Sequence, residues 1–206
     1  MTRTVLVPRE RVVRWFTNFA ARHGSPDFAV ESGRLLASAP DGSLASAALP
    51  FGCSYSGPAD VESFADAITP PPRWGVLLVR KGGFAIATVA ADRITGSKVG
   101  QRHVQGRTKA GGQSQQRFAR RRDNQAREAY QAAADHAARI LPGIAALICG
   151  GDRQAVEQVL TDSRLRSLAA LRVEPWLAVP DPRRAVLEQA VVDGCSVAIT
   201  VASDET

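Results

Sequence analysis

Two nearly continuous apolar runs, joined by a short glycine turn, constrain the fold of this chain most. Residues 74–80 read W-G-V-L-L-V-R, the turn is K-G-G, and residues 84–90 read F-A-I-A-T-V-A. Short apolar runs bounded by turn signals are typical of strands that are covered on both faces. A hairpin of such strands needs helices on each side of its sheet. The sequence therefore predicts an α/β fold in which a layered mixed β-sheet has flanking helices.

The covering helices can be recognised by their length and apolar spacing. No glycine or proline interrupts the chain from Ser114, a suitable N-cap, to the Pro142-Gly143 pair, which predicts a helix of about 27 residues. Its apolar positions recur at helical spacing and form one stripe: Phe118, Ala126, Ala129, Tyr130, Ala133, Ala137 and Ile140. A strand over residues 144–149, helices over 152–160 and 182–193, and a last strand over 196–201 complete the pattern.

The first 69 residues predict a small separate α/β unit. A short strand precedes a helix opened by Pro8 and ended by Gly24, and three strands follow with turns at Gly33 and at Asp41-Gly42. The tract Thr69-Pro-Pro-Pro72 is a stiff spacer. We therefore expect an N-terminal α/β extension over residues 1–69, of unassigned role, and a second domain over residues 73–206.

Residues 95–113 interrupt the regular pattern with five glycines and no apolar period, which predicts a long functional loop at about 95–114. The charge of the chain is concentrated here. Between Gly96 and Arg122 there are eight basic and no acidic residues, whereas the rest of the chain holds 18 basic and 20 acidic residues. A block of one sign indicates a polyanionic partner such as nucleic acid rather than a merely solvated surface.

The tripeptide Gly111-Gly112-Gln113 lies in this basic loop, at the foot of the long helix. Alone it is a weak signal, which a flexible surface loop before a helix explains better. Its continuation is more specific, because G-G-Q-S-x-x-R-F-A-R-x-R resembles the peptide-release loop in the middle domain of eukaryotic and archaeal class-one release factors. The hairpin before it and A-L-I-C-G-G-D after it resemble that ribonuclease H-like domain in the same order, over about residues 73–178.

The chain resembles most the VLRF-type peptidyl-tRNA hydrolases, stand-alone relatives of release factors that clear stalled ribosomes. This resemblance implies codon-independent release of the nascent chain by a cytoplasmic monomer. The implied partners are the large ribosomal subunit and peptidyl-tRNA, without a cofactor or a metal. We find no segment that resembles a codon-reading domain or a domain that recruits a translational GTPase.

The chemistry of the residues fits that implied reaction. Peptidyl-tRNA is an ester, and its hydrolysis needs a positioned water and stabilisation of the developing oxyanion. The amide of Gln113 does not titrate usefully, but it can orient the water, and its backbone N–H can stabilise negative charge. Gly111 and Gly112 permit a positive φ and a close approach to RNA. Gln115 and Gln116 are rivals that fall in the first turn of the predicted helix.

The predicted site therefore has a catalytic and an RNA-binding part. The catalytic residues are Gln113, Gly112 and Gly111. The RNA-binding residues share a basic or imidazole side chain inside the charged block: Lys98, Arg102, His103, Arg107, Lys109, Arg117, Arg120, Arg121 and Arg122.

Several other classes of protein need residues that this sequence lacks. A metal-dependent nuclease of similar fold needs several carboxylates on its strands, but the hairpin has none and Asp92 stands alone after it. Three widely spaced cysteines give no zinc pattern. The N-terminus lacks the apolar segment of a secretory signal, and no window approaches a membrane span. A non-enzymatic ribosome- or RNA-binding protein with the same basic arm remains as the alternative.

Overall fold

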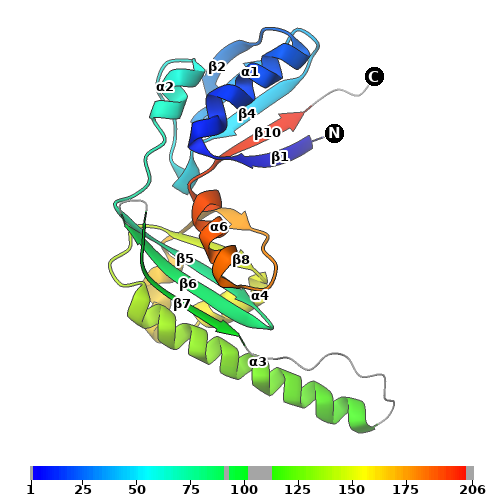
Figure 1. Cartoon of the computed structure of the whole chain (residues 1–206), viewed down its shortest axis with the longest axis vertical. Coiled ribbons are helices and arrows are strands. Elements are labelled where there is room, and N and C mark those ends of the chain that lie inside the picture. The colour runs from blue at the N-terminus through cyan, green and yellow to red at the C-terminus, as the bar shows by residue number, and fades with distance from the viewer. Residues whose placement is uncertain (1, 91–92, 102–112, 203–206) are drawn as a thin grey trace. The chain divides into compact units, whose positions relative to one another are not determined.

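The computed structural model describes residues 2–90, 93–101 and 113–202, without the side chains of residues 113–125. Within these residues the chain is mixed α/β and contains two five-stranded sheets (Figure 1). It divides into two compact units, one formed by residues 1–70 with 192–206 and one by residues 71–191.

The sheet of the first unit is antiparallel throughout and has helices on one face. Its strand order is β1 (Thr2–Val7), β10 (Val197–Ala202), β4 (Leu44–Ala48), β3 (Arg34–Ser38) and β2 (Asp27–Glu31). Buried side chains alternate along β3 and β4, as the two-residue period of a half-covered strand requires. They share one core with Phe16 and Phe19 of α1 (Val12–His23) and Phe64 of α2 (Val61–Asp66).

Local signals fix both helices of this unit. Gly24, with φ of 90°, ends α1 and donates its N–H to the carbonyl of Ala20 at 2.9 Å. The Asp60 carboxylate caps α2 by accepting from the N–H of Ser63 at 2.7 Å. Two short 3₁₀ turns, Arg9–Arg11 and Pro50–Gly52, complete the unit.

The last strand departs from the sequence-based division of the chain. We expected residues 196–201 to end the second domain, but β10 pairs with β1 and β4 in the sheet of the first unit. Its buried positions Val197 and Ile199 alternate with half-buried ones, which suits a sheet covered on a single face. Periodicity identified this strand but carries no information about which sheet it joins.

The second unit is built on the predicted mixed sheet. Its order is β7 (Arg93–Gln101), β6 (Gly83–Ala90), β5 (Arg73–Arg80), β8 (Leu147–Gly151) and β9 (Arg172–Leu177). The pairs β7–β6 and β6–β5 are antiparallel, whereas β5–β8 and β8–β9 are parallel. Strands β5 and β6 are buried almost throughout, so the prediction from their apolar runs is confirmed.

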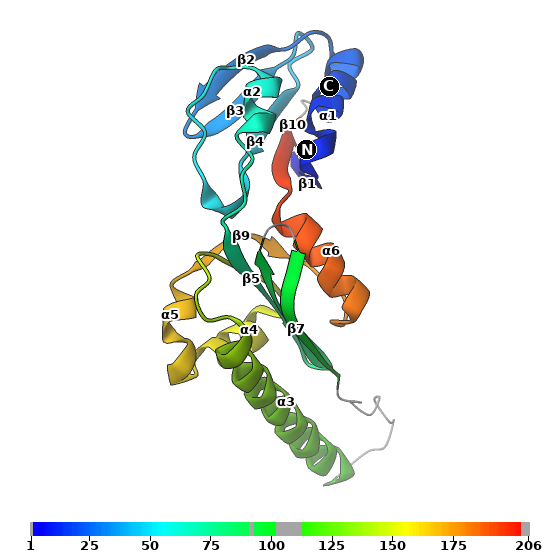
Figure 2. The same ribbon diagram turned by 60° about the vertical axis from the view of Figure 1, so that its left-hand side comes forward.

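Helices cover both faces of this sheet (Figures 1 and 2). On one face lie α3 (Gln113–Ile140), α4 (Arg153–Leu160), the 3₁₀ turn Ser163–Leu165 and α5 (Arg166–Ala169); α6 (Arg184–Gly194) lies on the other. The predicted α/β class, with a layered sheet and flanking helices, is confirmed.

Strand β7 corrects the predicted loop. Residues 95–101 belong to this edge strand, in a register that pairs Gly100 with Phe84. A Cβ on Gly100 would lie 2.4 Å from a carbon of the Phe84 ring, so the glycine makes room for the ring. Gly100 is therefore required for packing and does not mark a loop. The prediction of a loop from glycine content was wrong for this reason. Residues 102–112 lie outside the described residues.

None of the helices that the structure describes is long and apolar enough to cross a membrane.

Candidate functional site

The C-terminal half of α3, residues 126–140, is packed on the sheet, and we call it the anchored half. Ala129, Ala133 and Ala137 are buried in one core with Phe84 and Ile86 of β6. Their small side chains allow the helix to lie close to the strands. The hydroxyl of Thr88 on β6 donates to the carbonyl of Ile140, which fixes the last turn of the helix. The predicted apolar stripe is confirmed from Ala126 to Ile140, and Phe118 lies outside the described side chains.

The N-terminal end of α3 runs past the edge of the sheet in both ribbon views (Figures 1 and 2). Gln113 is the first residue of this helix, one position before the predicted cap Ser114. The first four backbone N–H groups of a helix have no partner inside it, and the helix dipole is positive there. Gly111 and Gly112 lie outside the described residues, and Gln113 is described by its backbone alone.

Of the predicted RNA-binding side chains, that of Lys98 is described, and it is exposed on β7. Lys98 pairs with Ile86, whose side chain belongs to the core shared with α3, so Lys98 projects on the α3 face of the sheet. Arg117, Arg120, Arg121 and Arg122 lie on α3, but their side chains are outside the description. Arg102, His103, Arg107 and Lys109 lie outside the described residues.

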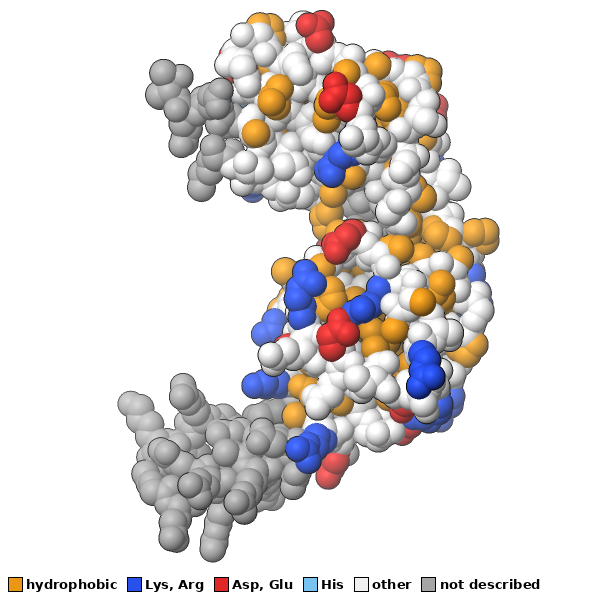
Figure 3. Space-filling view, turned by 180° about the vertical axis from the view of Figure 1, so that it is seen from behind, with side chains coloured by type: hydrophobic (Ala, Val, Ile, Leu, Met, Phe, Trp, Pro, Cys, Tyr) orange, Lys and Arg blue, Asp and Glu red, His pale blue; other side chains and the backbone are white. Residues whose placement is uncertain are grey.

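Sequence reasoning missed a basic residue on the other face of β7. The guanidinium of Arg184 on α6 donates to the hydroxyl of Ser97 at 2.9 Å and to the carboxylate of Glu188 at 2.7 Å. Ser97 and Lys98 are consecutive in a strand, so they project to opposite faces. Cationic groups therefore flank both faces of the strand that leads into residues 102–112. Figure 3 shows further Lys and Arg side chains on the second unit, with Asp and Glu among them.

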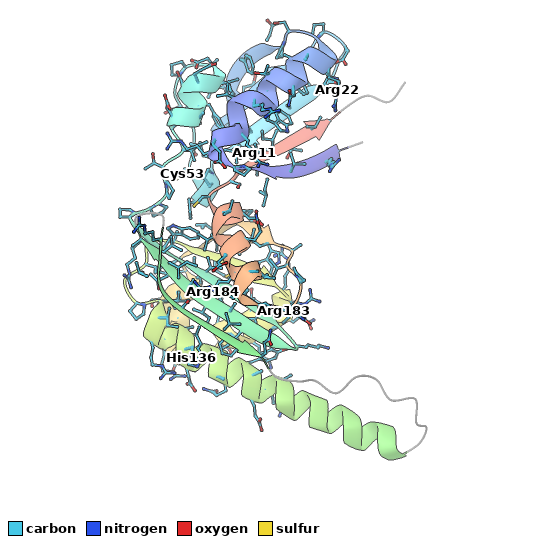
Figure 4. All side chains as sticks on the ribbon, viewed as in Figure 1. Arg11, Arg22, Cys53, His136, Arg183 and Arg184 are labelled. Carbon is cyan, nitrogen blue, oxygen red and sulfur yellow. The ribbon has the colours of Figure 1, made fainter. Side chains whose placement is uncertain are left out.

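No sequence signal links Arg184 to β7, because 87 residues separate it from Ser97. It is brought there by the placement of α6 on the face of the sheet opposite α3 (Figure 4).

His136 belongs to the anchored half of α3 and packs against β6 (Figure 4). Its ring lies against that of Phe84, with centroids 5.6 Å apart. Burial and the positive charges of Arg139 and Lys98 lower the pKa of His136 below 6.5. The imidazole is therefore neutral at pH 7, and its Nδ1 accepts a hydrogen bond from Arg139 Nη2 at 3.1 Å.

An ionic cluster ties the same half of α3 to the turn before α5. Arg164 Nη2 lies 2.6 Å from Asp135 Oδ1 on α3 and 2.7 Å from Asp162 Oδ2. Hydrogen bonds from Arg164 hold the pKa of Asp162 at about 2 and lower that of Asp135. The anchored half is thus held by apolar packing and by charge.

In the part of the chain that is described, no group of three or more His, Cys, Asp and Glu side chains is placed to hold a metal ion. Asp92 lies outside the described residues.

Comparison with solved structures gives low-identity matches. The chain has 12% identity and a TM-score of 0.44 to the Vms1 mitochondrial localization core, over 91% of this chain and 81% of that one. For the archaeal translation termination factor aRF1 the values are 10% and 0.38, over 94% of this chain. For Pelota of Archaeoglobus fulgidus they are 12% and 0.28, over 93% of this chain. The chain spans 66% of the length of aRF1 and 62% of that of Pelota.

The class of the protein follows from its sequence. No curated protein sequence matches it, but a family of release factors does, over more than half of its length. The chain belongs to the acVLRF1 family, the VLRF1 release factors of actinobacteria and chloroflexi, whose family model matches residues 72–200. The match covers nearly all of the second unit and continues into β10.

Proposed function

We propose that this protein is a peptidyl-tRNA hydrolase that frees nascent chains from tRNA on stalled ribosomes, without reading a codon. One observation carries the proposal: in a chain of a release-factor family, the Gln of Gly-Gly-Gln begins a 28-residue helix whose C-terminal half, residues 126–140, packs on the sheet. A long helix whose C-terminal half packs on the sheet is suited to carry a reactive loop into the crowded, RNA-lined catalytic centre of the ribosome.

In the proposed reaction, water attacks the ester carbonyl that joins the nascent peptide to the terminal ribose of tRNA. The bond between the carbonyl carbon and the ribose oxygen breaks, and the ribose oxygen takes a proton. Gln113 orients the attacking water through its amide, and its backbone N–H stabilises negative charge on the oxyanion or the leaving oxygen. Gly111 and Gly112 let the backbone approach the RNA without a Cβ in the way.

The charge at the start of α3 supports an RNA partner. From Gln113 to Arg122 the helix carries four arginines and no acid. Like charges four positions apart on a helix, as at 117 and 121, weaken the helix by about 0.2–0.5 kcal/mol per pair. A sequence selected for helix stability alone would alternate acids with these bases. We propose that these arginines dock on RNA phosphates together with Lys98, Arg102, His103, Arg107 and Lys109, and that Arg184 adds a cation on the other face of β7.

The test is release from purified, stalled ribosome–nascent chain complexes, followed as the appearance of free tRNA. Gln113→Ala should slow release by roughly a hundred- to a thousandfold, the usual loss when one well-placed donor is removed. Ribosome binding and the unfolding midpoint should stay at wild-type values, since Gln113 lies at the tip of the helix. Gln115→Ala and Gln116→Ala are matched controls from the same turn and should release normally.

The alternative is a non-enzymatic ribosome- or RNA-binding protein with the same basic arm. Reversal of Arg120, Arg121 and Arg122 would weaken ribosome binding in either case, so it does not separate the two functions. Gln113→Ala does, because a pure binding arm tolerates it in every assay. Release at the wild-type rate by that variant would overturn the catalytic assignment, and silent Gln115 and Gln116 variants would then favour the alternative.

A further inference from the structure

Two cavities of the first unit share one wall. A cavity of about 630 Å³ lies between β1 and the start of α1 and is lined by residues from Val5 to Asn18. A second, of about 260 Å³, lies beside the later turns of α1 and reaches Val201 of β10. Trp15 and Asn18 line both, so the two form one groove along α1, which we call the α1 groove.

The α1 groove is lined by arginines. Arg11 and Arg14 line the larger cavity and Arg22 lines the smaller, and all three are exposed. Positions 11, 14, 18 and 22 are three or four residues apart and therefore share one helix face. Figure 4 shows Arg11 and Arg22 near opposite ends of α1, which at 1.5 Å per residue are about 16 Å apart.

This positive charge is local to the α1 groove. Residues 1–70 contain six arginines and seven acidic residues, so half of the arginines of this segment line one groove. Within the described part of the chain, no carboxylate lies in ion-pair distance of Arg11, Arg14 or Arg22, whereas Arg9 pairs with Asp66, and His23 in the smaller cavity pairs with Asp41. An accumulation of cations without counter-charges raises the electrostatic cost of the free protein and favours an anionic ligand.

Trp15 adds an aromatic surface to the charge. Its ring stacks on Phe19, with centroids 5.6 Å apart and planes 12° apart, and meets the edge of Phe16 at 5.0 Å. These contacts hold the indole in one orientation while the residue stays partly exposed in the wall of the groove. A fixed, partly exposed indole between arginines is suited to stack a nucleic acid base while the arginines contact phosphates. The Asn18 amide beside it can hydrogen-bond a base edge.

We infer that the α1 groove binds single-stranded RNA, which gives the first unit a second RNA-contacting site separate from Gly-Gly-Gln. An acidic peptide could instead add to β1, whose only strand partner among the described residues is β10. Three features favour RNA: the arginines follow the helix rather than the strand edge, the aromatic ring lies among them, and a side-chain amide adjoins the ring. This inference goes beyond the proposed hydrolysis and does not depend on it.

The test uses the full-length protein and a fluorescein-labelled, 12-nucleotide single-stranded RNA of mixed sequence. Arg14→Gln combined with Arg22→Gln should weaken binding on the order of tenfold near physiological salt and make the log–log salt slope shallower by about 1.4. The matched control is Arg73→Gln with Arg166→Gln, an equal charge change on exposed residues of the second unit. The control should bind as the wild type does.

A second readout separates the α1 groove from the basic segment near Gln113. Ultraviolet cross-linking should attach nucleotide to the tryptic peptide over residues 15–22, W-F-T-N-F-A-A-R, which contains Trp15. Trp15→Leu should weaken binding by roughly fivefold to 150-fold, the usual range for loss of one stacked base. If this variant unfolds, the arginine pair and the cross-link still decide.

Unchanged affinity of the arginine variant together with no adduct on residues 15–22 would overturn the inference. Binding of polyglutamate or of phosphatidylserine vesicles that depends on Arg14 and Arg22, without such dependence for RNA, would also overturn it and identify the other occupant. Release activity reports separately on Gln113, so failure of either proposal can be told from failure of the other.

Discussion

The two halves of α3 differ in composition and in their position relative to the sheet, although they belong to one helix. Residues 126–140 contain seven alanines, two arginines and two acids, and their buried face rests on the sheet. Residues 113–125 contain four arginines and one acid, in the part of the helix that runs past the sheet (Figure 2). Packing of the first set stabilises the helix, because an isolated helix is marginal in water without an apolar face to pack.

Stability and function can thus be separated along one helix. The anchored half contributes core contacts, so its sequence is restricted by volume. The leading half, residues 113–125, runs past the edge of the sheet and carries four arginines. Substitutions in the two halves should therefore affect different measurements.

Matched proline substitutions give the largest expected contrast. Ala133 is fully buried in the anchored half, and Ala133→Pro should cost the second unit about 3 kcal/mol or more, because it removes a helix hydrogen bond and forces a clash in the core. Ala119→Pro makes the same change in the leading half. It should leave the urea midpoint of the second unit nearly unchanged while release falls. Equal losses of stability in the two variants would show that the leading half is part of the cooperative core.

Two glycines on β7 test how the sheet contributes to the packing of the anchored half. Gly100 makes room for Phe84, whose ring also lies against His136 in the anchored half. Gly100→Ala should destabilise the second unit by about 1–3 kcal/mol through overpacking.

Gly96→Ala is the matched control, since a Cβ there would meet its nearest neighbour, Ile140, at an ordinary 3.8 Å. Thermal unfolding followed by circular dichroism measures both variants. If Gly96→Ala proved as harmful as Gly100→Ala, strand propensity rather than the space beside Phe84 would be the cause.

The same contrast explains what could be predicted from the sequence. The buried hairpin of β5 and β6 and the stripe on α3 follow from the spacing of apolar residues, because burial requires that spacing. The glycine-rich composition of β7 concealed a strand, since the reason for Gly100 is a ring on the neighbouring strand. Contacts such as Arg184 with Ser97 depend on tertiary placement and leave no local pattern.

The candidate site divides in the same way. The motif from Gly111 to Gln113 and the surrounding charge could be proposed from the sequence, because the continuation R-F-A-R makes the resemblance to a peptide-release loop specific. The α1 groove could not be predicted from the sequence. Arg11, Arg14 and Arg22 line a cavity only in the folded protein, where β1 leaves space beside Trp15. Sequence reasoning therefore reached the residues near the proposed reaction but not those that surround a groove.

The ionic cluster of the anchored half gives the smallest expected effect, and it depends on pH. The folded-state pKa of Asp162 is about 2, below its ordinary 3.8, and that of Asp135 is lowered too. A depressed carboxyl pKa stabilises the fold above the unfolded-state pKa, and that stabilisation is lost as pH falls through the folded-state value. The loss should occur between about pH 4 and pH 2.

Arg164→Gln should lower the urea midpoint slightly at pH 6 and flatten its decline through this window. Arg166→Gln, which leaves the cluster intact, should keep the wild-type slope. The change should be modest because Arg164 and Asp135 are 48% and 45% exposed, and added salt should reduce it further. Parallel declines in all three proteins would mean that other carboxylates govern acid unfolding and that apolar packing alone anchors α3.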